Sequence, residues 1–131
     1  MILRKWGRPE EALALNNKKE AICHELGNRD GLQVSYGNQA LILKDLGRLE
    51  EALALLKKQE SICLELGNRA RLAHTYWYMA DLARARGDLP EARTRAEHAL
   101  AIFTELNMPK EIQSVKSDLE GIDRSDSPSV A

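Results

Sequence analysis

Apolar residues recur at helical spacing along the chain, and the middle of the sequence shows the pattern most clearly. Leu32, Tyr36, Ala40 and Leu43 are separated by three or four residues, which places them on one face of a helix. The polar residues between them fall on the other faces. This segment therefore predicts an amphipathic helix over residues 30–46.

A second apolar stripe follows this helix. It contains Leu49, Ala52, Leu53, Leu56, Ile62, Cys63 and Leu66. Gly47 separates the two stripes, and glycine ends a helix readily because it adopts the left-handed conformation at low steric cost. Glu50 and Glu51 lie in the first turn of the second helix, where carboxylates stabilise the positive end of the helix dipole. The two stripes predict antiparallel helices joined by a very short turn.

The same pair of helices returns along the sequence with a period of 40 residues. Of the 23 aligned pairs between 7–29 and 47–69, 17 are identical and no gap is needed. A fainter third copy follows at 87–106. A fixed period of this length predicts a stacked array, because one hairpin cannot bury both of its apolar stripes alone. We expect helices at 9–26, 30–46, 49–66, 70–86, 89–106 and 109–121, after a stub at 2–6.

The two ends of the array differ from its middle. Residues 1–6 align with 41–46, so the first helix is truncated. Residues 108–122 have one apolar side and one polar side, which is typical of a helix that caps an array. We therefore predict about three repeats in a single domain at 1–122, followed by a disordered tail at 123–131.

The pattern resembles the tetratricopeptide repeat family. The resemblance rests on an aromatic residue, a small residue, a turn glycine and an alanine at fixed spacing. These are Tyr36, Ala40, Gly47 and Ala52, with Tyr76, Ala80, Gly87 and Ala92 forty residues later. The period is most similar to that of the kinesin-light-chain-like and bacterial sensor-ATPase repeats, and the resemblance covers roughly residues 1–107. It implies an all-α fold: a right-handed superhelical solenoid of antiparallel helix hairpins with a C-terminal capping helix.

The chain also departs from the family pattern at one place in each of two repeats. Gln59 and Lys19 stand where the family usually has the small residue that is present here at Ala99. We expect looser packing at these two positions.

Composition narrows the class of partner. Nineteen Lys and Arg against 20 Asp and Glu give a net charge of −1, so no basic excess attracts nucleic acid or an anionic membrane. The apolar runs are too short to span a bilayer, and no signal-peptide core follows Met1. We expect a cytoplasmic chain whose partner is a protein or peptide.

The two cysteines and the histidines predict no cofactor or metal. Cys23 and Cys63 occupy the same place in successive repeats, where equivalent positions are separated by about 10 Å, the diameter of a helix. A disulfide needs Cα atoms within about 7 Å, so we interpret both as small buried residues. The sequence has no nucleophile elbow, phosphate loop or paired catalytic carboxylates, so we predict that the chain is not an enzyme.

The family resemblance implies a peptide-binding groove on the exposed face of each first helix. The residues on this face are Val34, Asn38, Leu41, Lys44 and Asp45 in the second repeat, with His74, Trp77, Tyr78, Asp81 and Arg84 in the third. Asn38 resembles the asparagine with which this family holds the backbone of a bound peptide. Trp77 and Tyr78 have a second interpretation, in which they pack against the next helix of the array.

Two functions remain open from the sequence. The first is a protein–protein interaction scaffold that binds an extended peptide or a partner helix in the concave groove. The second is a structural end segment of a larger array, such as the sensor region of a signalling ATPase, with no ligand of its own.

The truncated first hairpin also predicts an apolar edge. It would be formed by Ile2, Leu3, Trp6, Ile22, Cys23 and Leu26. Contiguous exposed apolar surface usually has a partner, so we expect a homodimer closed around a twofold axis through this edge. Asn16 argues partly against this homodimer. It stands where the next repeat has Leu56 in its buried stripe, and a polar residue there lets the edge tolerate water.

Overall fold

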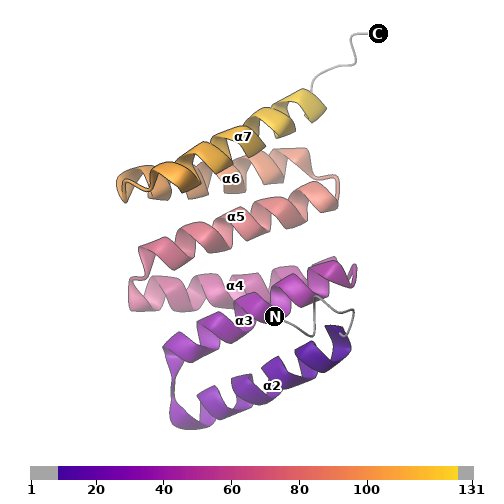
Figure 1. Cartoon of the computed structure of the whole chain (residues 1–131), viewed down its shortest axis with the longest axis vertical. Helices are drawn as coiled ribbons and strands as arrows, with labels where there is room; N and C mark the ends of the chain where they lie inside the picture. Colours follow the sequence, from indigo (N-terminus) through magenta and orange to yellow (C-terminus); the bar gives the residue numbers. More distant parts are fainter. Residues whose placement is uncertain (1–8, 127–131) are drawn as a thin grey trace. The chain divides into compact units, whose positions relative to one another are not determined.

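The computed structural model describes residues 9–126 and divides the chain into two compact units, Met1–Asn68 and Arg69–Ala131. The described helices are α2 (Pro9–Leu26), α3 (Arg29–Asp45), α4 (Leu49–Leu66), α5 (Arg69–Ala85), α6 (Leu89–Glu105) and α7 (Pro109–Asp126) (Figure 1). No strand occurs between residues 9 and 126, and the prediction of an all-α fold is confirmed. The predicted stub at 2–6 lies outside the described residues.

In the first unit, α3 packs against both α2 and α4 (Figure 1). Leu32 and Tyr36 of α3 form the core with Ile62 of α4, and Cys23 and Leu55 pack against this cluster. Much of each apolar stripe predicted for α3 and α4 is thus buried, whereas Leu66 at the end of the second stripe is 45% exposed. Cys23 faces inward, toward this core, rather than the predicted edge.

Each of the five turns between the described helices contains a residue in the left-handed conformation. Four are glycines with φ between 66° and 80°, namely Gly27, Gly47, Gly67 and Gly87. The fifth is Asn107 with φ of 56°, and asparagine tolerates this conformation better than most residues. The next amide then donates back into the helix, as Asn68 N does to Cys63 O at 2.9 Å. These residues make the short turns that the sequence predicts.

Gly37 lets α4 approach α3 closely. Gln59 is fully buried, and its Nε2 donates to the carbonyl oxygen of Gln33 at 2.7 Å. A Cβ atom on Gly37 would lie 2.5 Å from that Nε2. The expectation of looser packing at Gln59 is therefore wrong, because its amide fills the space above the glycine. The third repeat reverses the arrangement, with Trp77 at the position of Gly37 and Ala99 at that of Gln59.

In the second unit, α6 packs against both α5 and α7. The core of this unit combines small residues on α6 with larger ones on all three helices. Its buried members include Leu72, Met79, Leu82, Ala92, Ala96, Ala99, Ile102, Phe103, Val115 and Ile122. The alanines let α6 lie close to its neighbours, and Phe103 fills the remaining space.

The last helix extends further than the sequence predicts. We expected a helix end at 121 and a tail from 123, but α7 continues to Asp126. Ile122 is buried, and the Asp123 carboxylate accepts a hydrogen bond from Nε of Arg93 on α6 at 3.0 Å. These contacts hold the last turn on α6. Pro128 follows, and a helix usually ends at or before the residue preceding a proline. Residues 127–131 of the predicted tail lie outside the described residues.

The fit between Gly37 and Gln59 predicts a double-mutant effect. Gly37→Ala should lower the free energy of unfolding by about 1 kcal/mol, because overpacking outweighs the better helix propensity of alanine. In a Gln59→Ala background, the same substitution should instead raise it by about 0.5–1 kcal/mol. Urea unfolding of the four proteins measures both values. Equal effects of Gly37→Ala in the two backgrounds would contradict the proposed fit.

Candidate functional site

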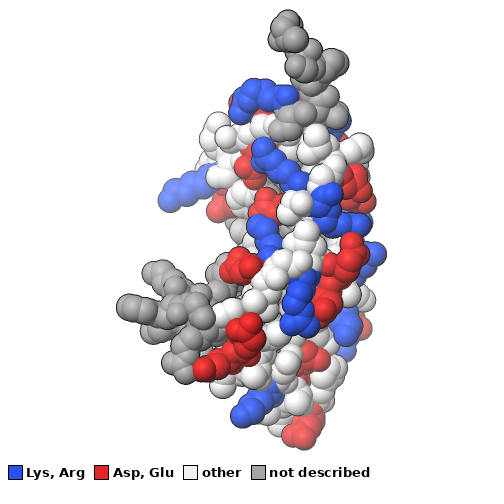
Figure 2. Space-filling view, turned by 90° about the vertical axis from the view of Figure 1, so that its right-hand side faces the viewer, with Lys and Arg blue, Asp and Glu red and all other residues white. Residues whose placement is uncertain are grey.

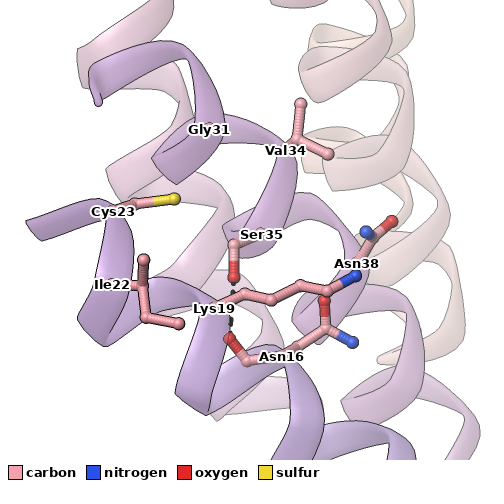
Figure 3. Close-up of a pocket in the computed structure, with 8 residues that line it drawn as sticks. All are labelled: Asn16, Lys19, Ile22, Cys23, Gly31, Val34, Ser35 and Asn38. Atoms are coloured by element: carbon pink, nitrogen blue, oxygen red, sulfur yellow. Dashed lines mark hydrogen bonds between the residues drawn. The ribbon is translucent and has the colours of Figure 1, made fainter. Parts of the chain in front are cut away.

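A pocket of about 330 Å³ lies between α2 and α3 of the first unit. Its lining residues are Asn16, Lys19, Ile22, Cys23, Gly31, Val34, Ser35 and Asn38 (Figure 3). The four α2 residues and the four α3 residues follow helical spacing, so one face of each helix forms a wall. The pocket is therefore a product of the α2–α3 hairpin itself.

Hydrogen bonds fix the base of this pocket. Ser35 Oγ donates to the carbonyl oxygen of Asn16 at 3.0 Å, and Asn16 Nδ2 donates to the carbonyl oxygen of Ala12 at 3.0 Å. Asn16 and Ser35 are both buried. Asn16 thus places a polar group inside the hairpin, where the next repeat has Leu56.

The mouth of the pocket combines apolar and polar side chains. Val34 is 39% exposed and Ile22 is 53% exposed. Lys19 is exposed and extends across the pocket in the view of Figure 3, toward the side where Asn38 lies. Asn38 is half-buried. The site can therefore accept an apolar group and offer an amide and an ammonium beside it.

The structure brings together residues that sequence analysis assigned to two different surfaces. Val34 and Asn38 belong to the predicted groove, whereas Ile22 and Cys23 belong to the predicted edge, and all four line this pocket. The other groove residues of α3 lie further along the helix, with Leu41 and Lys44 half-buried and Asp45 exposed. The i, i+3, i+4 spacing of Lys19, Ile22 and Cys23 was the available sequence signal.

The remaining residues of the predicted edge are placed only in part. Leu26 is 75% exposed and Ile22 is also largely exposed. Cys23 is half-buried against the core of the first unit. Ile2, Leu3 and Trp6 lie outside the described residues.

In the second unit, α5 places Trp77 against its neighbours. Its Nε1 donates to the Asp118 carboxylate of α7 at 2.7 Å. Its ring centroid lies 5.8 Å from that of Phe103 on α6, in an edge-on arrangement. This geometry favours the packing interpretation for Trp77, although the side chain keeps partial exposure. Arg84 also lies close to α7. A Cβ atom added to Gly121 of α7 would lie 2.8 Å from the Arg84 guanidinium.

The other predicted groove residues of α5 are half-buried, as Trp77 is, whereas Arg84 is exposed. The half-buried residues are His74, Tyr78 and Asp81. The His74 ring lies 5.1 Å from that of Phe103 and 6.4 Å from that of Tyr78. Burial lowers the pKa of His74, Arg71 lowers it further, and Glu111 acts in the opposite direction. The neutral imidazole is thus the form that fits this aromatic cluster.

Sequence analysis missed a second pocket of about 320 Å³ in the first unit. It is lined by Leu13, Asn17, Gln39, Leu43, Arg48, Glu51, Ala54 and Leu55. Arg48 Nη2 donates to Glu51 at 2.6 Å, and this bond raises the pKa of the guanidinium. The charged side chains of Arg48 and Glu51 in this lining are thus paired with each other.

The described residues contain neither a metal-binding cluster nor a membrane-spanning helix. They hold no cluster of three or more His, Cys, Asp and Glu side chains with metal-binding geometry. No helix among them combines the length and the hydrophobicity that crossing a membrane requires. Acidic and basic side chains are interspersed on the face shown in Figure 2.

The environment of His74 predicts a pH dependence of stability. Its folded-state pKa lies below the unfolded value of about 6.5, so the unfolded chain binds more protons between these two pKa values. The free energy of unfolding should therefore fall as the pH drops from about 6.5 through the folded-state pKa. Urea unfolding at about pH 7.5 and about pH 5.5 measures the loss, which His74→Gln should reduce. An equal loss in both proteins would assign the effect to other groups.

Comparisons with known proteins address the fold and the family. A family model described as "Tetratricopeptide repeat" matches residues 31–105. Among solved structures, the crystal structure of BtubC (BKLC) from P. vanneervenii aligns with a TM-score of 0.86 and 24% identity. The alignment covers 93% of this chain and 51% of that one, so the chain spans about half the length of BtubC. No curated protein matches.

The structural alignment shows that the chain has the fold of BtubC. The family model covers more than half of the chain, including all of α4 and α5. The chain therefore belongs to the tetratricopeptide repeat family.

Proposed function

We propose that the chain is a protein–protein interaction scaffold that holds an extended peptide or a partner helix on the exposed face of α3, beside the α2–α3 pocket. The family supports a general scaffold role, and tetratricopeptide repeats are generally non-enzymatic. The observation that carries the finer proposal is the pocket itself. Its volume of about 330 Å³ lies within the range of about 300–1,000 Å³ that is usual for ligand sites.

The chemistry of the pocket selects the kind of peptide. An apolar side chain would pack beside Val34, which is substantially exposed. The Asn38 amide can both donate to and accept from a peptide backbone. Lys19 would attract an acidic group at the mouth of the pocket. The preferred ligand is thus a segment with an apolar residue next to an acidic one.

The residues of α3 beyond the pocket would extend this surface. Leu41, Lys44 and Asp45 follow Asn38 along the same helix, so a bound segment that runs along α3 would meet them. On α5, we retain His74, Tyr78 and Asp81 as predicted contacts of a ligand. Trp77 and Arg84 remain predicted contacts only through the parts of their side chains that α6 and α7 leave uncovered.

A structural role in a larger array is the second candidate. It is favoured by the exposure of Ile22, which is 53% exposed whereas its counterpart Ile62 is 5% exposed. A segment of this kind would need no ligand for α3. If the chain has this structural role, substitutions at Val34 and Asn38 should not change the affinity for any peptide.

The test uses peptides selected from a random displayed library on the wild-type chain. Asn38→Ala should weaken the selected peptides about tenfold, because one backbone hydrogen bond contributes about 1–1.5 kcal/mol. Val34→Asp should weaken them at least as much, because it places a charge where an apolar side chain packs. Fluorescence anisotropy with labelled peptides measures both dissociation constants.

The matched control is Leu64→Asp, which alters an apolar residue of the same unit that is 57% exposed and lies outside the pocket. It should leave the dissociation constants unchanged. Circular dichroism of each variant checks that helix content is retained. A library that yields only peptides insensitive to both pocket substitutions would reject the α3 surface as the site.

A further inference from the structure

Within residues 9–126, the face of α2 that carries Lys18, Ile22 and Glu25 lacks the contacts that the equivalent faces of α4 and α6 make. In the second repeat, three positions of α4 contact the preceding helix α3. The Lys58 ammonium lies 5.6 Å from the centre of the Tyr36 ring, and Ile62 packs against the same side chain. Glu65 accepts a hydrogen bond from Nε of Arg29 at 2.7 Å. A cationic, an apolar and an acidic residue of α4 thus bind one face of α3.

The third repeat shows equivalent contacts at two of these positions and a buried isoleucine at the other. The His98 ring lies 5.3 Å from the Tyr76 ring, and Ile102 is buried. Glu105 accepts a hydrogen bond from Nε of Arg69 at 3.2 Å. The arrangement is therefore a property of the repeat, with Arg, Leu and Tyr of the first helix meeting three positions of the second.

The corresponding residues of α2 are Lys18, Ile22 and Glu25, and all three are exposed. The exposure of Ile22 is 53%, whereas that of Ile62 is 5%. Leu26 extends the same stripe and is 75% exposed. This face of α2 is complementary to a helix that the described residues do not supply.

We propose that Lys18, Ile22, Glu25 and Leu26 form a docking face for a helix of another protein chain that carries Arg, Leu and Tyr at positions i, i+3 and i+7. These three positions lie on one side of a helix. The arginine of the bound helix pairs with Glu25, and its leucine and tyrosine side chains cover Ile22. The ammonium group of Lys18 lies over the tyrosine ring, as that of Lys58 lies over Tyr36. Both charges of the face and its apolar centre are thereby matched.

This docking face shares Ile22 with the α2–α3 pocket and otherwise lies on a different side of α2. Successive helix residues are rotated by about 100°, so Lys19 and Cys23 lie on one side of Ile22, whereas Lys18 and Glu25 lie on the other. The first pair lines the pocket and the second does not. Substitution of Glu25 therefore tests binding to the docking face without altering the lining of the pocket, whereas substitution of Ile22 changes both surfaces.

A second copy of this chain is a poorer occupant than a helix with the stated residues. Its own matching side chains are used internally, since Leu32 is 1% exposed, Tyr36 is 5% exposed and Leu72 is 2% exposed. The helix α7 of a second copy does not match the face either. It has Pro109 and Lys116 at the positions where α3 and α5 have arginine and tyrosine. A homodimer through this edge would leave Glu25 and Lys18 without those partners.

The probe is a fluorescent synthetic peptide with the sequence of residues 69–86, which contains the Arg, Leu and Tyr pattern without glycine or proline. It should bind the full-length chain with one-to-one stoichiometry in fluorescence anisotropy. Ile22→Asp should weaken this binding at least tenfold. Leu64→Asp, at a residue of similar exposure on α4, should leave it unchanged.

A charge exchange tests the orientation of the bound helix. The peptide with Arg69→Glu should bind the wild-type chain at least fivefold more weakly than the unaltered peptide. It should regain that affinity with the chain carrying Glu25→Arg. Glu25 is exposed, so this variant should keep its helix content in circular dichroism.

Three results would overturn the proposal. One is equal binding of the peptide to wild type and Ile22→Asp, with both proteins folded. Another is failure of the charge exchange to restore affinity. The third is a stable dimer of the wild-type chain in sedimentation across the micromolar range that Ile22→Asp dissociates, because a second copy would then cover this face.

Discussion

The structure depends on the fact that one helix hairpin carries more apolar surface than it can bury. In the first unit, Leu32 and Tyr36 lie on α3, where Ile62 of α4 packs against them and Cys23 of α2 covers them from the other side. In this unit, the first helix α3 is thus stabilised by the second helices before and after it, α2 and α4. Where the described residues supply no such neighbour, the equivalent surface stays open, as at Ile22.

The sequence predicts the helices well because their signals are local. Gly47 and Gly67 adopt the left-handed conformation that ends a helix, and the apolar spacing between them defines the buried stripe. The end of α7 had no local signal of this kind. It depends on Ile122 and on the contact of Asp123 with Arg93, thirty residues earlier. Such a tertiary contact overrides the serine-rich composition from which an earlier end was predicted.

The candidate site was less predictable, because it depends on which helix faces meet. Helical spacing placed Val34 and Asn38 on one face of α3, yet it could not show that Lys19 and Ile22 of α2 line the same pocket. The environment of Trp77 depends on Asp118, which is 41 residues away in the sequence. The residues next to Trp77 in the sequence do not indicate that its indole donates to a residue of another helix.

Differences between repeats of the same fold are what give this chain individual sites. Phe103 occupies in the third repeat the position that Cys23 and Cys63 occupy in the others, and the rings of His74 and Trp77 pack against it. Cys23 is smaller, and with the buried Asn16 it lines an open pocket instead. Side-chain volume at a repeated position thus differs between repeats that share one backbone arrangement, and close packing makes such differences matter locally. A recognition surface can therefore arise in one repeat while the stability of its neighbours is maintained.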